Sequence, residues 1–233
     1  TVTYIHSAAI TGLTPGGSYE YRVGYTDRRS EWFPLKTAAG SNFKALIFPD
    51  SQSADYGVWK NTAMPAWERN KDAQFFINIG DLVDNGQSGY QWNAWFEGCE
   101  DMIRQIPLVP LDGNHEMYDL NWQMHLPVSY TTLFDLPKNG LPEYPDQFYS
   151  FDYGDIHFTV LDTQFTELKD FEPDLLKDEV AWVKKDLEKT EKKWKIVLMH
   201  KDVLQYGFNP ETRPETREEG FSEEGKIFMP LFD

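Results

Sequence analysis

The sequence predicts a mixed α/β (α+β) fold, with a larger domain over residues 40–233 after a short all-β segment over residues 1–39. Three observations support this. Short apolar runs bounded by Gly, Pro or Asp are typical of buried strands. Helical patterns stand between these runs, as in α/β domains. In the first segment, apolar and polar residues alternate around a Pro-Gly-Gly turn. The four apolar runs lie at residues 44–50, 75–81, 106–116 and 195–200.

Residues 1–39 contain three predicted strands, which are too few to close a core alone. The strands are expected at residues 6–10, 19–25 and 32–37, followed by a linker. The pattern Leu13-Thr-Pro15-x-x-x-Tyr19-x-Tyr21 resembles fibronectin type III domains around their tyrosine corner. We therefore expect this segment to be the C-terminal part of a fibronectin-like domain whose upstream strands are missing from the chain.

One amphipathic pattern predicts the clearest helix of the larger domain. Apolar residues recur at spacings of four, three and four over residues 173–192, while Lys and Glu cover the other face. Pro173 suits the first turn of this helix. A second helix is expected over residues 87–105, and residues 149–161 predict a hairpin that turns at Gly154.

Two stretches, residues 121–148 and 203–225, show no regular pattern. Long irregular segments in compact domains are usually either functional lids or disordered. Both interpretations stay open for each stretch.

Charge and composition exclude several classes of function. The formal net charge is −16, and such a field repels nucleic acid and anionic lipid. We therefore expect no nucleic-acid partner. No apolar run approaches the length of a membrane span, and no signal-peptide pattern is present. The lone Cys99 excludes an internal disulfide framework.

Each of the four apolar runs ends on a polar side chain that could bind a metal ion. Two runs end on Asp50 and Asp81, a third on the tripeptide that begins at Asn114, and the fourth on His200. In open sheets flanked by helices, ligands bind just beyond the carboxyl ends of the strands. Four strand ends with oxygen and nitrogen donors indicate one convergent metal site, and with it hydrolytic chemistry. These donors suit Mn, Fe or Zn better than Ca.

Two motifs carry a resemblance to a known family. They are Gly80-Asp81-Leu82-Val83-Asp84-Asn85-Gly86 and Gly113-Asn114-His115-Glu116. With Asp50 before them and His200 after them, they resemble the calcineurin-like metallophosphoesterase superfamily over residues 43–233. The segment ahead of them further resembles the purple-acid-phosphatase branch, which places a fibronectin-like module before its catalytic domain. The resemblance implies four layers, with two sheets packed together and flanked by helices.

The resemblance also implies a metal-dependent hydrolase of phosphate monoesters or diesters. In this family two divalent or trivalent transition-metal ions, about 3.5–4 Å apart, share a hydroxide and hold both sides of an in-line displacement. Asp81 matches the carboxylate that bridges the two ions, and Asp50 matches a ligand of the first ion. Asn114 matches the amide ligand of the second ion, and His200 matches an imidazole ligand of that same ion.

Two further residues match the family's catalytic groups. His115 matches the histidine that faces the phosphoryl group, and its expected role is to protonate or hydrogen-bond the leaving oxygen. Asp84 matches the second aspartate of Gly-Asp-x-x-Asp, which orients that histidine. We expect it to fix the tautomer of His115.

The chain departs from the family pattern at several positions. Gln52 stands where many relatives have a ligand His, and weak binding through its amide oxygen stays open. Asp84 stands where purple acid phosphatases have a ligand Tyr, so no tyrosinate–iron colour is expected. Asn85 replaces the Arg of Ser/Thr protein phosphatases, which argues against a phosphoprotein substrate. The family's final Gly-His-x-His does not occur in the sequence, so we expect the larger domain to be C-terminally incomplete.

The expected partner is a small phosphorylated substrate, and no protein partner is predicted. By analogy with bacterial phosphatases that carry fibronectin-like modules, the expected location is secreted or at the cell surface. The alternative function is a catalytically degenerate extracellular binding or adhesion module on the same scaffold. Gln52 and the missing Gly-His-x-His favour this alternative, whereas the four strand-end donors oppose it.

Simpler interpretations exist for single residues. Gly-Asp and Gly-Asn-His also occur as ordinary turns, since Gly, Asn and Asp tolerate a positive φ. His157 lies inside a predicted strand and is expected to be structural. His125 lies in an irregular stretch and could reach the substrate.

Overall fold

The computed structural model describes residues 4–205 and 220–232. Its strands are β1 (Ser18–Tyr21), β2 (Phe33–Lys36), β3 (Ala45–Phe48), β4 (Phe75–Ile79), β5 (Leu108–Leu111), β6 (Tyr149–Tyr153), β7 (Ile156–Val160), β8 (Trp194–Leu198), β9 (Leu204–Gln205) and β10 (Gly220–Phe221). Its helices are α1 (Tyr56–Arg69), α2 (Gly89–Gly98), α3 (Glu100–Ile103), the 3₁₀ turn η1 (Asn114–Met117), α4 (Val128–Leu133), α5 (Leu175–Lys189) and α6 (Glu223–Phe232). Among the described residues, none of the helices combines the length and apolar content that a membrane span requires.

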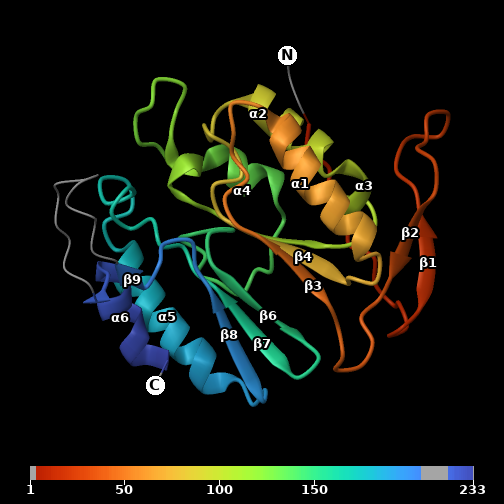
Figure 1. Cartoon of the computed structure of the whole chain (residues 1–233). Coiled ribbons are helices and arrows are strands. Elements are labelled where there is room, and N and C mark those ends of the chain that lie inside the picture. Colours follow the sequence, from red (N-terminus) through yellow and green to blue (C-terminus); the bar gives the residue numbers. More distant parts are fainter. Residues whose placement is uncertain (1–3, 206–219, 233) are drawn as a thin grey trace.

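Two three-stranded sheets form the centre of the larger domain (Figure 1). The first has the order β3-β4-β5 with all strands parallel, and the second has the order β6-β7-β8. In the second sheet β6 runs antiparallel to β7, and β7 runs parallel to β8. Helices α1, α2 and α3 lie on the outer side of the first sheet, while α5 and α6 lie on that of the second. The predicted mixed α/β fold, with helices that flank the sheets, is therefore confirmed.

Aromatic side chains fill the space between the two sheets. The ring centroid of Phe75 on β4 lies 6.2 Å from that of Phe151 on β6 and 5.9 Å from that of Phe158 on β7. Fully burying one such side chain contributes about 1.5–3 kcal/mol to folding. This packing holds the two sheets face to face, so that the ends of β4 and β8 meet at one edge.

A layer of tryptophans attaches α1 and α2 to the first sheet. Trp59 of α1 stacks on Trp95 of α2 at 5.7 Å, and its indole N–H donates to the main-chain carbonyl of Trp95 at 3.0 Å. The ring of Trp59 also meets Phe48 of β3 at 5.2 Å, edge to face. The helix predicted over residues 87–105 is present in two pieces, because the chain leaves the helical path at Cys99.

The other predicted elements agree with the structure only in part. The helix α5 and the β6–β7 hairpin fall inside the predicted ranges 173–192 and 149–161. The strand predicted at residues 6–10 is wrong, because these residues are exposed and pair with no strand among those described. The hairpin of β1 and β2 contacts the larger domain through Tyr21, whose hydroxyl donates to the carbonyl of Arg104 at 2.8 Å.

Candidate metal centre

Polar side chains from the ends of three strands meet at one edge of the first sheet. Asp50, Asp81 and His200 follow β3, β4 and β8, and their ligand atoms all lie within 4.8 Å of one another. The Nε2 atom of His200 lies 3.4 Å from Asp81 Oδ1 and 3.4 Å from the amide oxygen of Asn114, which follows β5. The structure thus brings together the four residues predicted as metal ligands.

Two glycines explain why the backbone can approach so closely here. A Cβ atom at Gly80 would overlap the ring of His200, and one at Gly113 would overlap the Oδ1 atom of Asp81. Gly80 also has a φ of 72°, a left-handed conformation that glycine adopts without strain. Glycine is therefore needed before Asp81 and before Asn114, because a larger residue would clash with the cluster. An ordinary turn would not impose this requirement.

Asp81 stands at the centre of the cluster and is held from several sides. Its Oδ1 atom accepts the main-chain N–H of His115 at 3.0 Å, and its Oδ2 atom accepts the side-chain amide of Gln52 at 3.2 Å. Its main-chain carbonyl accepts the N–H groups of Ser51 and Gln52, both at 3.0 Å, which joins the ends of β3 and β4. Asp81 itself has a φ of 49°, uncommon for a residue with a side chain. The two carboxylate oxygens therefore face different partners.

Glu116 supports the cluster, a role that the sequence did not predict. Its buried carboxylate accepts four main-chain N–H groups: from Asp81 at 3.0 Å, Leu82 at 2.9 Å, Val83 at 3.2 Å and Gly113 at 2.7 Å. It thereby ties the loop after β4 to the loop after β5. Burial, followed by the charge of Asp81, raises the pKa of Glu116 to about 8. The only sequence signal for this role was the position of Glu116 in the Gly-Asn-His-Glu motif.

His115 lies beside this cluster and is oriented by its neighbour Asp84. The Nδ1 atom lies 2.8 Å from the main-chain carbonyl of Asp84 and 3.4 Å from its carboxylate. The Nε2 atom points the other way and lies 4.0 Å from Asp81 Oδ2. Asp84 is itself held by Tyr56, whose hydroxyl accepts the Asp84 N–H at 3.2 Å. The two predicted catalytic residues are therefore in contact.

The histidine that follows β8 is arranged as a metal ligand needs to be. The Nδ1–H of His200 donates to the carbonyl of Ile79 at 2.9 Å, which turns Nε2 toward Asp81 and Asn114; a metal ion bound there would displace the proton from Nε2. Burial opposes protonation, but the Asp81 carboxylate outweighs it and raises the pKa of His200 to about 9. The site therefore attracts positive charge.

The donor set fits transition-metal ions. Two carboxylates, one amide oxygen and one imidazole nitrogen are the mixed donors that Mn, Fe and Zn accept. The Oε1 atom of Gln52 is buried and has no hydrogen-bond partner among the described residues, which leaves it available as a further oxygen donor.

The contacts of two further histidines lie outside this cluster. His157 contacts Asp152 and Asp186 on the second sheet and α5. His125 contacts the carbonyl of Leu126 at 3.1 Å. Residues 121–148 contain the short helix α4, and most of the stretch 203–225 lies outside the described residues.

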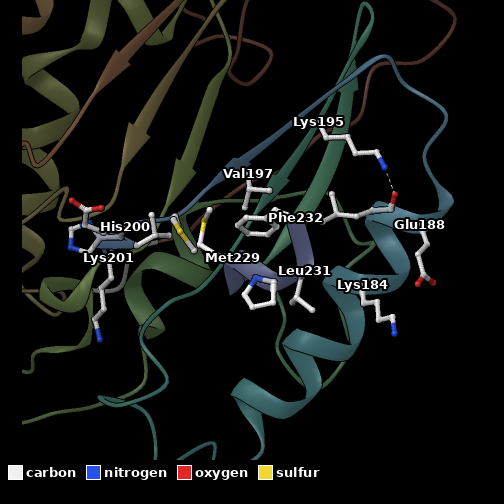
Figure 2. A pocket seen from close by; sticks show the side chains of 14 residues that line it. Lys184, Glu188, Lys195, Val197, His200, Lys201, Met229, Leu231 and Phe232 are labelled. Carbon is white, nitrogen blue, oxygen red and sulfur yellow. Dashed lines mark hydrogen bonds between the residues drawn. The ribbon is translucent and has the colours of Figure 1, made fainter. Parts of the chain in front are cut away.

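A cavity in the described part of the chain has His200 in its lining (Figure 2). It has a volume of about 910 Å³ and runs between β8, α5 and α6. Val197, Met229 and Phe232 lie together inside it, and Lys195 closes its far end by donating to the carbonyl of Leu187 at 2.7 Å. Of the predicted site residues only His200 lines it, so this cavity adjoins the metal cluster at that residue.

Comparison with known proteins agrees with this geometry. Purple acid phosphatase 15 of Arabidopsis thaliana is 26% identical over 228 residues, covering 84% of this chain and 41% of the relative. Probable inactive purple acid phosphatase 27 of the same plant is 24% identical over 191 residues, covering 69% of this chain and 30% of the relative. The chain therefore spans less than half the length of these relatives.

A solved structure shares the fold. Purple acid phosphatase PPD1 from yellow lupin (Lupinus luteus) seeds superposes with a TM-score of 0.66 at 18% identity, covering 94% of this chain and 43% of that one. The family described as "Calcineurin-like phosphoesterase" matches residues 50–226, which include every strand-end residue of the cluster. The chain belongs to the calcineurin-like phosphoesterase family.

Proposed function

We propose that this chain is a metal-dependent hydrolase of phosphate esters that uses a binuclear centre. The observation that carries the proposal is the convergence of Asp50, Asp81, Asn114 and His200 from four separate strand ends. Structural turns alone would not need two carboxylates and an imidazole in mutual contact. Membership of the phosphoesterase family supports the same chemistry.

Each proposed ligand can be assigned to one of the two ions. The two oxygens of Asp81 face different neighbours, His200 on one side and Gln52 on the other, as a carboxylate that bridges two ions requires. Asn114 and His200 share one side of the cluster and would hold the same ion. Asp50, which matches the family's ligand of the other ion, would hold that ion, with Gln52 as an additional weak ligand.

Bound Mn, Fe or Zn ions would supply Lewis-acid activation of the ester and of water. The chain's own residues would then position the substrate. His115 would present Nε2 to the leaving oxygen, because its Nδ1–H is held by the carbonyl of Asp84, and the imidazolium form would donate its Nε2 proton to that oxygen. The Glu116 carboxylate would keep the loops after β4 and β5 at a fixed spacing while this happens.

The proposed substrate is a small phosphate ester, and the proposed location is outside the cytoplasm. We also propose residues 1–39 as part of a fibronectin-like module and residues 40–233 as the phosphoesterase domain. The hydroxyl of Tyr19 accepts the N–H of Thr14 at 2.8 Å, which supports a tyrosine-corner arrangement in the first unit.

A second candidate is a degenerate binding module, since two matched relatives carry the name probable inactive purple acid phosphatase. The intact cluster at Asp81 favours the enzyme over this rival. To separate them, purified chain is loaded with Mn or Zn, and bound metal and phosphate release from a panel of esters are measured. Bound metal with turnover, both lost in Asp81→Asn, would support the enzyme. Absence of metal after loading would favour the binding module.

A further inference from the structure

A short hairpin-like turn places two aromatic rings directly against the proposed catalytic histidine. The ring centroid of Tyr118 lies 5.4 Å from that of His115, and the ring centroid of Trp122 lies 6.4 Å from it. Both rings stand nearly perpendicular to the imidazole, at 81° and 89°. Tyr118 and Trp122 also contact each other at 5.5 Å. We call the exposed surface of these two rings the aromatic platform.

The aromatic platform is held in place by hydrogen bonds. The carboxylate of Asp119 accepts the N–H groups of Asn121 at 2.7 Å and Gln123 at 2.9 Å, and an isolated bridge pairs Tyr118 with Met124. The buried side chain of Asn85 donates to the main-chain carbonyl of Asp119. Since Asn85 belongs to the loop that carries Asp81, the turn and the metal cluster are fixed to each other.

Trp122 occupies a position that disfavours a large side chain. Its φ is 60°, in the left-handed region where Gly, Asn and Asp are the usual residues. Its side chain is 54% exposed, so core packing does not compensate for this conformation. A tight turn alone would be formed better by glycine. The combination of an unfavourable backbone, an exposed indole and contact with His115 indicates a surface that binds something planar.

We propose that the aromatic platform binds an aromatic ring on the alcohol part of the phosphate ester. This inference rests on the proposed function, because it assumes that the phosphoryl group lies at the metal cluster and that its leaving oxygen faces Nε2 of His115. A ring joined to that oxygen directly or through one carbon would then lie within reach of Trp122. The exposed indole would stack on it, an interaction that tolerates many kinds of ring.

Two sources can supply such a ring: a simple aryl or benzyl ester, or a nucleotide base. A base is separated from its phosphate by a sugar, so it would reach beyond Trp122 unless the sugar folds back. Comparing Trp122→Ala with the unchanged chain on benzyl phosphate and adenosine 5′-monophosphate separates the two sources. The ester whose kcat/KM falls more in Trp122→Ala identifies the source of the ring.

The decisive test is binding of two phosphonates that are not hydrolysed. Benzylphosphonate and cyclohexylmethylphosphonate have nearly the same size, and only the first has a planar π-face. Calorimetry on the metal-loaded chain should give tighter binding of benzylphosphonate, by about 5-fold or more, as expected for one stacking contact. In Trp122→Ala this preference should fall to about one, and in Trp122→Phe much of it should return.

Trp194 offers a matched control, because its side chain is 59% exposed and it begins β8, at the opposite end of that strand from His200. Trp194→Ala should leave the preference for benzylphosphonate unchanged. Equal affinity of the unchanged chain for both phosphonates, or a preference that survives in Trp122→Ala, would overturn the aromatic platform while the proposed function stands. Failure of the metal-loaded chain to bind either phosphonate would overturn both.

Discussion

The imidazole of His115 is held by the main chain of Asp84, at 2.8 Å from its carbonyl oxygen, more closely than by its carboxylate, at 3.4 Å. Because a carbonyl oxygen can only accept, Nδ1 carries a proton, and the proton that His115 would donate to the leaving oxygen is a second one on Nε2. The family resemblance implied that Asp84 orients His115, without specifying which of its atoms makes the contact. The shorter contact is made by a main-chain carbonyl oxygen, which any residue at position 84 would supply.

A first prediction follows for variants of these two residues. Asp84→Asn keeps the carbonyl, so we expect kcat/KM for a phosphate ester to fall by less than about 10-fold. His115→Asn removes the proton donor and should lower kcat/KM by roughly 10²–10⁴-fold. Steady-state kinetics on one ester, with bound metal measured in the same samples, checks both values. If Asp84→Asn lost as much activity as His115→Asn at unchanged metal content, the carboxylate would be the orienting group.

A second prediction concerns the glycine that precedes Asn114. A Cβ atom at Gly113 would overlap the Oδ1 and main-chain N atoms of Asp81, so Gly113→Ala must displace that carboxylate. We expect metal affinity to fall by about 10–100-fold, as is usual when the groups that orient a metal ligand are disturbed. Metal titration followed by mass spectrometry measures the loss.

Gly89 provides the control for this substitution. A Cβ at Gly89 would meet no atom within 4 Å, and the residue begins α2, where alanine is well tolerated. Gly89→Ala should bind metal as the unchanged chain does. Equal metal affinity in Gly113→Ala would mean that Asp81 does not take part in the site.

The central strands and the site could be predicted because their signals are local. The run Phe75–Ile79 is apolar except for Asn78 and is followed by Gly80 and Asp81, and the rule for strand ends then predicts where the polar residue lies. The strand expected at residues 6–10 was wrong for a related reason. Alternation gives the strand period, but pairing depends on a partner that no local pattern supplies.

The support of the site could not be predicted from the sequence. The four N–H groups that Glu116 accepts belong to two loops more than 30 residues apart in the chain, as the separation of 35 residues between Glu116 and Asp81 shows. The aromatic platform likewise depends on the turn that sets Trp122 beside His115. Such contacts form only when the first sheet assembles. Sequence motifs and periodicity therefore cannot predict them.

A third prediction separates structural from catalytic histidines. The two ring nitrogens of His157 lie 2.7 Å from Asp152 and 2.8 Å from Asp186, so the ring connects β6, β7 and α5. His157→Gln cannot make both contacts, and we expect the free energy of unfolding to fall by about 1–3 kcal/mol. Urea denaturation measures it, with exposed His6→Gln as the control. Metal content should stay unchanged, and its loss would give His157 a role in the site.

A fourth prediction concerns pH. Burial raises the pKa of Asp162 from 3.8 to about 7, and its Oδ2 atom has no hydrogen-bond partner among the described residues. Between these two pH values the folded chain holds a proton that the unfolded chain has released. The free energy of unfolding should therefore fall as the pH rises from about 4 to about 7.

Asp162→Asn tests this dependence without removing the local hydrogen bond. The Oδ1 atom of Asp162 accepts the N–H of Gln164 at 2.8 Å, and asparagine keeps that oxygen but cannot ionise. The variant should lose the part of the pH dependence that Asp162 contributes and exceed the stability of the unchanged chain at pH 8 by about 1–4 kcal/mol. Urea denaturation at pH 5 and pH 8 measures the difference, and the exposed Asp170→Asn should show none. A variant less stable at pH 8 would mean that Asp162 is ionised in the folded chain and stabilised there.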